Sequence, residues 1–261
     1  MNLTAGVSLY GGAAYLPAEA GAVTLNRLRE HFSVGTLTID VHHNLKDRAV
    51  CRVPDVGECS TSGFAIRSFV IDFTLSIVAG SSTDATLSTG DGFSFSYGDI
   101  PYGLVSERGA GRGLRVQFRQ YTHNELSVHH LGRPLLTTNL SLPTNGSTHV
   151  QIVLNNAQLS LTLGGLPLIH HLPIIHWNPI DTWRMVFGAR TGASTASHEL
   201  RDVSIKAGPH EDMHAVTVAL SANTQQYTTD NVLLSLLPIA TYGSYSPSTG
   251  ASGGGIDVIL F

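Results

Sequence analysis

The amino-acid sequence predicts an all-β protein, built as a sandwich of packed sheets. Its dominant signal is the alternation of apolar and polar residues, which is typical of half-buried strands. Glycine accounts for 27 of the 261 residues and charged residues for only 13%, a composition that suits many short strands joined by turns. No segment shows helical spacing over three turns, although residues 19–32 are compatible with one short helix.

Several segments place every second residue on one apolar face. Their apolar positions are Leu37, Ile39 and Val41; Phe69, Ile71, Phe73, Leu75 and Ile77; Phe93, Phe95 and Tyr97; Leu114, Val116 and Phe118; and Trp183, Met185 and Phe187. Two more alternating runs, at 150–154 and 159–163, flank Asn155-Asn156, whose tolerance of positive φ predicts a tight hairpin turn. So many strands separated by turns predict a sandwich.

Charge and hydropathy argue against nucleic-acid binding and against a membrane-spanning helix. The formal net charge is -4, and no basic stripe is available to neutralise a phosphate backbone, so nucleic acid is excluded as a partner. No apolar run approaches the roughly 18 residues that a membrane-spanning helix requires. No cofactor-binding motif is found either, and no cofactor is expected.

Sequons and cysteines indicate an extracellular protein. The first residues lack the basic and apolar regions of a signal peptide. Three N-x-Ser/Thr sequons nevertheless occur, at Asn2, Asn139 and Asn145, and the last two lie in a turn-like stretch that favours N-glycosylation. Cys51 and Cys59 are the only cysteines, and a disulfide closing this small loop is favoured over two free buried thiols.

Three stretches go beyond periodicity. They are GDGFSFSYG at 90–98, GLRVQFRQYTHNELSVHHLGRPL at 113–135 and WRMVFGARTGASTASHELRDVSI at 183–205. In order, spacing and residue type they resemble the concanavalin-like or laminin-G-like (L-type lectin-like) jelly-roll family, over roughly residues 5 to 206. The resemblance implies a jelly-roll β-sandwich.

The resemblance also implies candidate glycan contacts. Legume-type members of the family bind sugar through the Asp of the D-G strand and a nearby Asn, positioned by calcium and a second metal. Asp91 matches that Asp, although it could instead be a turn residue that hydrogen-bonds its own backbone beside Gly92. The candidate contacts are Asp91, Tyr97, Tyr102, Tyr121 and Asn124.

The metal carboxylates of that family are missing here. They belong to a V-E-F-D-type strand, and this chain has Val116-Gln117-Phe118-Arg119 in its place. Because a guanidinium cannot ligate a cation and hard cations need several oxygen ligands, no calcium site of the legume-lectin type is expected.

No catalytic constellation is found. Glycosidases on this fold place paired carboxylates on one strand, and the sequence has no such pair. A His-His pair on a strand cannot act as one bidentate unit, because adjacent side chains on a strand point to opposite faces. The histidines are therefore expected to be exposed or singly hydrogen-bonded. They are His42-His43, His129-His130, His170-His171, His176 and His198. No nucleophile elbow accompanies the serines, so the chain is not expected to be an enzyme.

A second resemblance covers the end of the chain. Residues 216–229 and 242–261, VTVALSANTQQYTT and YGSYSPSTGASGGGIDVILF, resemble the junction between consecutive IPT/TIG Ig-like repeats. The expected domains are therefore a lectin-like sandwich at 1–206, a linker and the closing hairpin of an Ig-like repeat at 207–240, and the truncated start of an IPT/TIG repeat at 241–261. A final strand without a closing turn indicates a fragment of a larger extracellular protein.

These features predict a structural or adhesive module of a secreted, glycosylated surface protein or filament, with other domains of the same long chain and neighbouring subunits as partners. The alternative is a glycan-binding lectin module, and a glycoside hydrolase is disfavoured by the missing carboxylate pair. The expected location is extracellular, secreted or at the cell surface.

We expect Cys51 and Cys59 to be disulfide-bonded, because two thiols in a short Pro- and Gly-bearing loop approach each other with little strain. Quantitative thiol labelling of the unreduced, denatured protein should find no free thiol. Two free thiols per chain would contradict the disulfide and weaken the extracellular assignment.

Overall fold

The computed structural model describes residues 3–11, 14–16, 22–26, 33–43, 65–80, 91–120, 124–143, 145–192, 195–208, 214–218, 225–227 and 233–236. Every regular element within these ranges is a β-strand. The described part of the chain contains no helix long and apolar enough to cross a bilayer.

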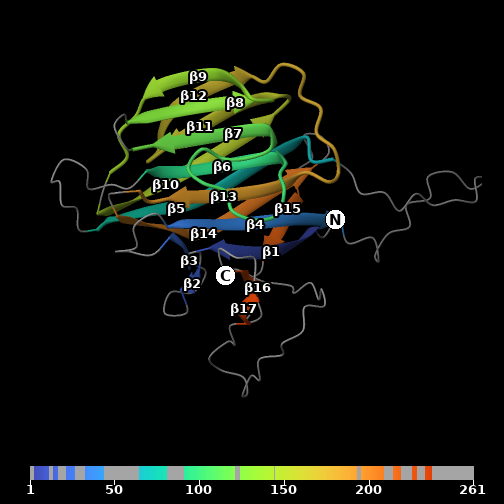
Figure 1. Ribbon diagram of the computed structural model, residues 1–261. Helices are drawn as coiled ribbons and strands as arrows, with labels where there is room; N and C mark the ends of the chain where they lie inside the picture. Colours follow the sequence, from blue (N-terminus) through green and yellow to red (C-terminus); the bar gives the residue numbers. More distant parts are fainter. Residues whose placement is uncertain are drawn as a thin grey trace, which may run out of the picture.

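Two antiparallel sheets lie face to face (Figure 1). The front sheet has the strand order β1 (Leu3–Gly11), β4 (Val34–His43), β13 (Arg184–Arg190), β6 (Gly92–Asp99), β7 (Arg112–Arg119), β8 (Glu125–His130) and β9 (Arg133–Asn139). The back sheet has the order β2 (Ala14–Leu16), β3 (Ala22–Asn26), β14 (Ala196–Gly208), β5 (Ser68–Ala79), β10 (Gly146–Asn155), β11 (Gln158–Leu163) and β12 (Leu166–Pro173). The chain passes several times from one sheet to the other, for example from β4 to β5 and from β13 to β14, so the predicted all-β sandwich is confirmed.

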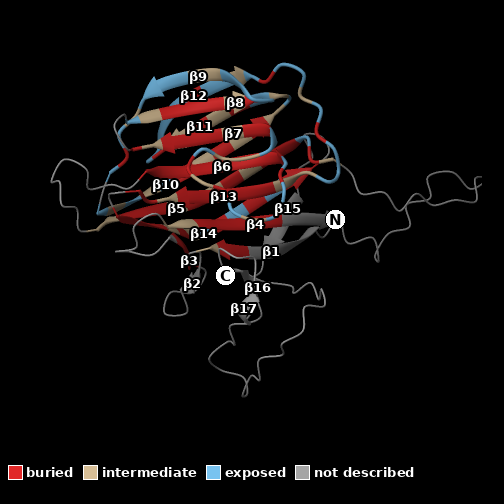
Figure 2. Ribbon diagram, viewed as in Figure 1, coloured by how far each residue is buried: buried red, intermediate tan, exposed pale blue. Residues whose placement is uncertain are grey.

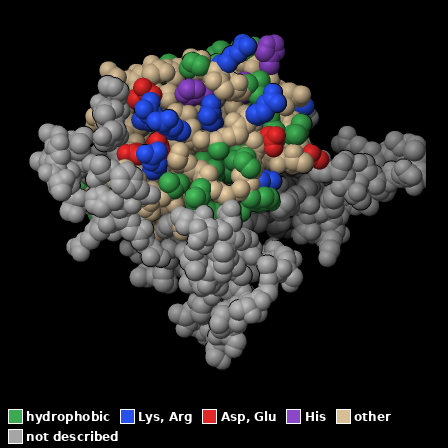
Figure 3. Space-filling model, viewed as in Figure 1, with side chains coloured by type: hydrophobic (Ala, Val, Ile, Leu, Met, Phe, Trp, Pro, Cys, Tyr) green, Lys and Arg blue, Asp and Glu red, His purple; other side chains and the backbone are tan. Residues whose placement is uncertain are grey.

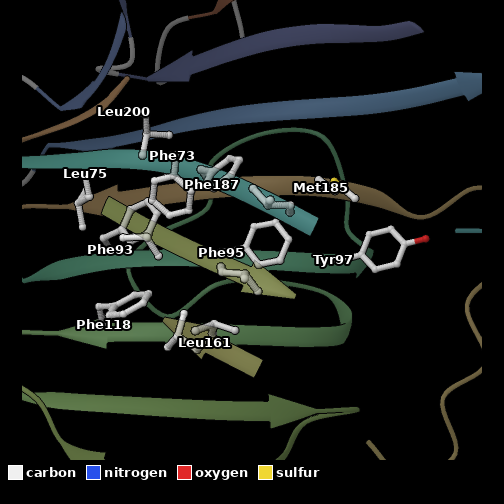
Figure 4. Close-up of a cluster of buried hydrophobic side chains, with 14 of the residues drawn as sticks. Phe73, Leu75, Phe93, Phe95, Tyr97, Phe118, Leu161, Met185, Phe187 and Leu200 are labelled. Atoms are coloured by element: carbon white, nitrogen blue, oxygen red, sulfur yellow. The ribbon is translucent and has the colours of Figure 1, made fainter. Parts of the chain in front are cut away.

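Phenylalanine rings join the two sheets. Phe187 of β13 packs edge-on against Phe73 of β5, with 5.4 Å between ring centroids, and also contacts Phe93 and Phe95 of β6 (Figure 4). All four rings are fully buried. Burying one such side chain contributes about 1.5–3 kcal/mol, and each favourable ring pair adds about 0.5–1.5 kcal/mol. Buried residues fill the space between the sheets, whereas β9 and β12 form exposed edges (Figure 2).

The alternation predicted for the strands is correct wherever side chains are described. Among the described residues, those that were predicted to face inward are buried, apart from Trp183. Trp183 is only partly buried because it precedes β13. The β10–β11 hairpin turns one residue later than predicted, at Asn156 and Ala157, with φ of 48° and 56°. This pair of positive φ angles defines the type I′ geometry that matches strand twist.

Residues 22–26 correct another expectation. This segment was compatible with a helix, but it forms β3 and pairs with β14 and β2. Burial of Val23 and Leu25 explains the preference, because the strand gains cross-strand and core packing that an isolated helix would lack.

The segment beyond Lys206 continues into the same sheet system. β15 (His214–Val218) pairs antiparallel with β14 and parallel with β1. β16 (Gln225–Tyr227) pairs with β1 and with β17 (Leu233–Leu236). The expected division into domains at residue 206 stays a prediction, and residues 241–261 lie outside the described part of the chain.

The loop at 100–110 crosses the outer face of the front sheet (Figure 1). The Ser94 hydroxyl donates a hydrogen bond to the Ser106 carbonyl at 2.7 Å, and the Thr36 hydroxyl accepts one from the Val105 amide at 2.6 Å. Gly188 of β13 makes this close approach possible, because a Cβ there would lie 2.3 Å from the Val105 carbonyl oxygen. The loop is therefore held against the sheet at fixed points.

Gly188→Ala should displace this loop and destabilise the protein by about 1–3 kcal/mol, since the new methyl group cannot coexist with the Val105 carbonyl. Urea unfolding gives the free energy, and trypsin cleavage after the exposed Arg108 reports on the loop. Gly146→Ala is the matched control, because no heavy atom lies within 4 Å of a Cβ at that position. Equal stability and equal cleavage of the two variants would contradict the packing described here.

Candidate functional site

Asp91 anchors a charged cluster at one end of the front sheet. It directly precedes β6, and its carboxylate pairs with Nε of Arg190 at 2.9 Å. Its backbone amide donates to the Arg190 carbonyl, while its own carbonyl accepts from the amide of Gln120. A Cβ on Gly192 would lie 2.6 Å from the carboxylate, so the glycine makes room for it. Asp91 therefore joins the ends of β6, β7 and β13 and is more than a local turn residue.

The protonation of Asp91 is set by competing effects. Burial raises its pKa above the ordinary value, and the nearby carboxylate of Glu107 raises it further. The positive charge of Arg190 is the strongest opposing influence, and Arg108 and Arg119 also lower the pKa. The cluster thus places three guanidinium groups around two carboxylates.

Residues on the neighbouring strand do not form a metal site. The Gln117 amide donates to the Arg108 carbonyl at 2.7 Å and accepts from the Ser127 hydroxyl, so protein groups already engage it. The Arg119 guanidinium pairs with Glu125 at 3.5 Å. Within the described ranges, no three His, Cys, Asp or Glu side chains gather in a way that could hold an ion. A cation would also face the guanidinium groups around Asp91, so this donor set does not fit calcium.

The remaining candidate glycan contacts are not all brought together. Asn124 is exposed beside the start of β8, at the same end of the sheet as Asp91. Tyr97 and Tyr102 lie at the opposite end, about 20 Å away along β6 at roughly 3.3 Å per residue. Tyr121 lies outside the described residues.

Tyr97 is corrected from a candidate surface contact to a core residue. Its ring is 1% exposed and its hydroxyl donates to the Ile66 carbonyl at 3.0 Å. It packs edge-on against Trp183 and also contacts Trp177. Tyr102 is 57% exposed, with the Arg184 guanidinium 3.7 Å from its ring centre.

Sequence reasoning missed most of the charged cluster. Alternation along β13 could have located Arg190, because Met185, Phe187 and Ala189 face the core and the intervening residues must face outward. Glu107 carried no such signal, because its position depends on how a loop crosses the sheet.

One histidine expectation also needs correction. His170 and His171 do not point to opposite faces: their rings stack with centroids 4.0 Å apart. His171 has a positive φ of 53° where the pairing of β11 and β12 shifts register, which rotates its side chain toward its neighbour. His198 is fully buried, and this burial lowers its pKa to about 4.

The predicted modification sites are only partly described. Asn139 is exposed at the end of the edge strand β9. Asn145 is exposed in a turn with φ of 55°, and its side-chain oxygen accepts from the Ala79 amide at 2.9 Å. Asn2, Cys51 and Cys59 lie outside the described residues. Glycosylation and the disulfide remain predictions.

The sequence matches no protein-family model and no curated protein. Solved lectin structures are nevertheless similar in fold. Winged bean acidic lectin in complex with methyl-α-D-galactose is 16% identical, with a TM-score of 0.54 over 78% of this chain and 92% of the lectin. Lectin II from Ulex europaeus is 14% identical, with a TM-score of 0.52 over 78% and 93%.

The exoplasmic/lumenal domain of VIP36, in a form bound to Ca²⁺ and Man3GlcNAc, is 11% identical, with a TM-score of 0.50 over 77% of this chain and 84% of that domain. Identities this low show the fold alone, which is the L-type, legume lectin-like sandwich that the sequence predicted. The comparisons give no support to the expected IPT/TIG junction.

Arg190→Gln should destabilise the protein by about 1–3 kcal/mol at neutral pH, because it leaves a buried carboxylate without its cation. Since burial raises the folded-state pKa of Asp91, ionised Asp91 opposes folding, and this cost disappears below its unfolded pKa. The loss should therefore shrink as the pH falls toward about 3. Urea unfolding of both proteins at each pH measures it.

Asp91→Asn in the Arg190→Gln background is the control. The double variant should regain most of the lost stability at neutral pH, since a neutral amide needs no counter-charge. A loss that is equal at both pH values, or that the second substitution leaves unchanged, would contradict the assigned pair.

Proposed function

We propose that this chain is a glycan-binding module of the lectin type and not an enzyme. The supporting observation is the position of Asp91, which matches the sugar-binding Asp of legume-type lectins in sequence and lies at the same end of the sheet as exposed Asn124. Lectin II from Ulex europaeus and winged bean acidic lectin are named as lectins. The winged bean lectin is in complex with methyl-α-D-galactose, and the VIP36 domain is in a form bound to Ca²⁺ and Man3GlcNAc. They support glycan binding better than a purely structural or adhesive role.

The proposed site works without calcium. Arg190 takes the place of a cation by holding the Asp91 carboxylate in a fixed orientation at 2.9 Å. The amide of Asn124 supplies both donors and an acceptor at the surface, which is the chemistry that sugar hydroxyl groups require. Glycan binding at this end of the sheet then depends on protein groups alone.

We also propose an extracellular or lumenal location, with N-glycans at Asn139 and Asn145. The VIP36 domain is described as exoplasmic or lumenal, which agrees with the sequons and the cysteine pair. The proposal includes an Ig-like repeat after residue 206, with other domains of a longer chain and neighbouring subunits as partners.

A glycan array of neutral and acidic glycans, probed with the intact chain in the presence of either calcium or a chelator, tests the function. We expect binding that the chelator leaves unchanged and that Asn124→Ala weakens at least about tenfold, the effect of losing one or two hydrogen bonds. Gln158→Ala, which removes an exposed amide from the back sheet, should change nothing. Binding to no glycan, with head-to-tail self-association of the chain, would overturn the proposal in favour of the structural module. Binding that requires calcium would overturn the metal-free site.

A further inference from the structure

The outer face of the front sheet carries several arginines. On β7, Leu114, Val116 and Phe118 enter the core, so the side chains of Arg115 and Arg119 point outward. Arg190 lies on the outer face of β13, and Arg108 lies on the loop that crosses the sheet. We call these four residues, Arg108, Arg115, Arg119 and Arg190, the arginine face. Figure 3 shows basic side chains gathered on this side of the molecule, next to acidic ones.

The acidic partners lie beneath the guanidinium groups. Arg119 is 37% exposed above Glu125 at 22%, Arg190 is 39% exposed above Asp91 at 10%, and Arg108 is 69% exposed beside Glu107 at 5%. Each recorded ion pair uses one nitrogen of its arginine. A guanidinium has further N–H groups in a planar fork, and these suit a second oxyanion from the solvent side.

Arg115 has no carboxylate partner among the described residues. Its Nε is buried without a hydrogen bond there, close to Gly109 of the covering loop. Its positive charge also adds to the effect of burial in lowering the pKa of His129, which lies opposite it on β8. The face therefore contains one cation that no described acidic group neutralises.

The loop fixes the arrangement before any ligand arrives. The Arg108 carbonyl accepts from Gln117, and the Ser106 carbonyl accepts from Ser94, so the loop around Arg108 is tied to β6 and β7. Arg119 and Arg190 are each oriented by a carboxylate. Preorganised guanidinium groups lose less conformational entropy on binding, which favours a specific anionic ligand over non-specific attraction.

We propose that the arginine face binds the carboxylate or sulfate group of an acidic glycan. The inference rests on the proposed glycan-binding function and specifies its ligand class. A carboxylate is planar with two equivalent oxygens, and a sulfate ester presents three terminal oxygens on a tetrahedral sulfur. Both can accept paired N–H hydrogen bonds from arginine. A nucleic-acid backbone is disfavoured because the chain has a net charge of -4 and the arginines form a compact group and not a stripe.

Calorimetric titration of the intact chain with defined oligosaccharides tests the inference. The probes are a sulfated heparin-derived tetrasaccharide, a hyaluronan tetrasaccharide, a chitin tetrasaccharide as the neutral sugar and a DNA oligonucleotide of matched charge. We expect the acidic sugars to bind more tightly than the neutral one, and comparison of the first two separates sulfate from carboxylate recognition.

Arg119→Gln should weaken the binding of the acidic sugar at least about tenfold, the effect of one charge-assisted contact, and leave the neutral sugar unaffected. Arg201→Gln is the matched control, because Arg201 pairs with Glu199 on the back sheet and is 36% exposed. It should retain full affinity. Unchanged near-ultraviolet circular dichroism of both variants establishes that they are folded. Arg115→Gln breaks no ion pair, and it should also weaken the binding of the acidic sugar.

The outcomes separate the inference from the function on which it rests. Binding of the neutral sugar as tightly as the acidic ones, or equal losses in Arg119→Gln and Arg201→Gln, would overturn the acidic ligand and leave glycan binding standing. Equal binding of the DNA oligonucleotide would overturn recognition of a sugar. Binding of no oligosaccharide would overturn both.

Discussion

The packing of phenylalanine rings between the sheets fixes which residues the front sheet presents to solvent. Phe93 and Phe95 of β6, Phe118 of β7 and Phe187 of β13 lie in one buried cluster, and a shift of one residue in any of these strands would exchange its two faces. Because the large rings occupy the interior, the small and polar residues between them must face outward. The outer face therefore receives serines from β6, a glutamine and two arginines from β7, and glycine and arginine from β13. The candidate site is a consequence of core packing.

A loop covers part of that outer face and contributes side chains that the sheet itself does not supply. Gly188 allows the Val105 carbonyl to approach β13, and Thr36 and Ser94 hold the loop through hydrogen bonds. The loop brings Glu107 and Arg108 into the neighbourhood of Asp91. Arginine–carboxylate pairs then gather at the end of the sheet where Asp91 lies, and the acidic ligand class that is proposed above follows from their exposed guanidinium groups.

Most of the fold could be predicted from the sequence, because period-2 alternation is strong in β5, β6, β7 and β10 and core packing enforces it. Asp91 became a candidate through its D-G motif, and Gln117 and Arg119 indicated that this strand does not supply the carboxylates of a legume-type calcium site. Other features depend on contacts between distant segments: the loop that positions Glu107, the burial of Tyr97 at a strand end, and the left-handed backbone of His171 that stacks two histidines. Local sequence patterns carry no information about such contacts. In β3, pairing with neighbouring strands overrides a local sequence that is also compatible with a helix.

The claim that the outer face of the front sheet is the ligand site is tested most directly by hydrogen–deuterium exchange with and without the acidic tetrasaccharide. We expect slower exchange in peptides that cover 104–110, 115–120 and 188–192, which lie along the arginine face. Peptides from the back sheet, at 146–163, should exchange at the same rate in both conditions. Protection confined to the opposite end of the sandwich, around 97–102 and 177–184, or to the back sheet would contradict the account.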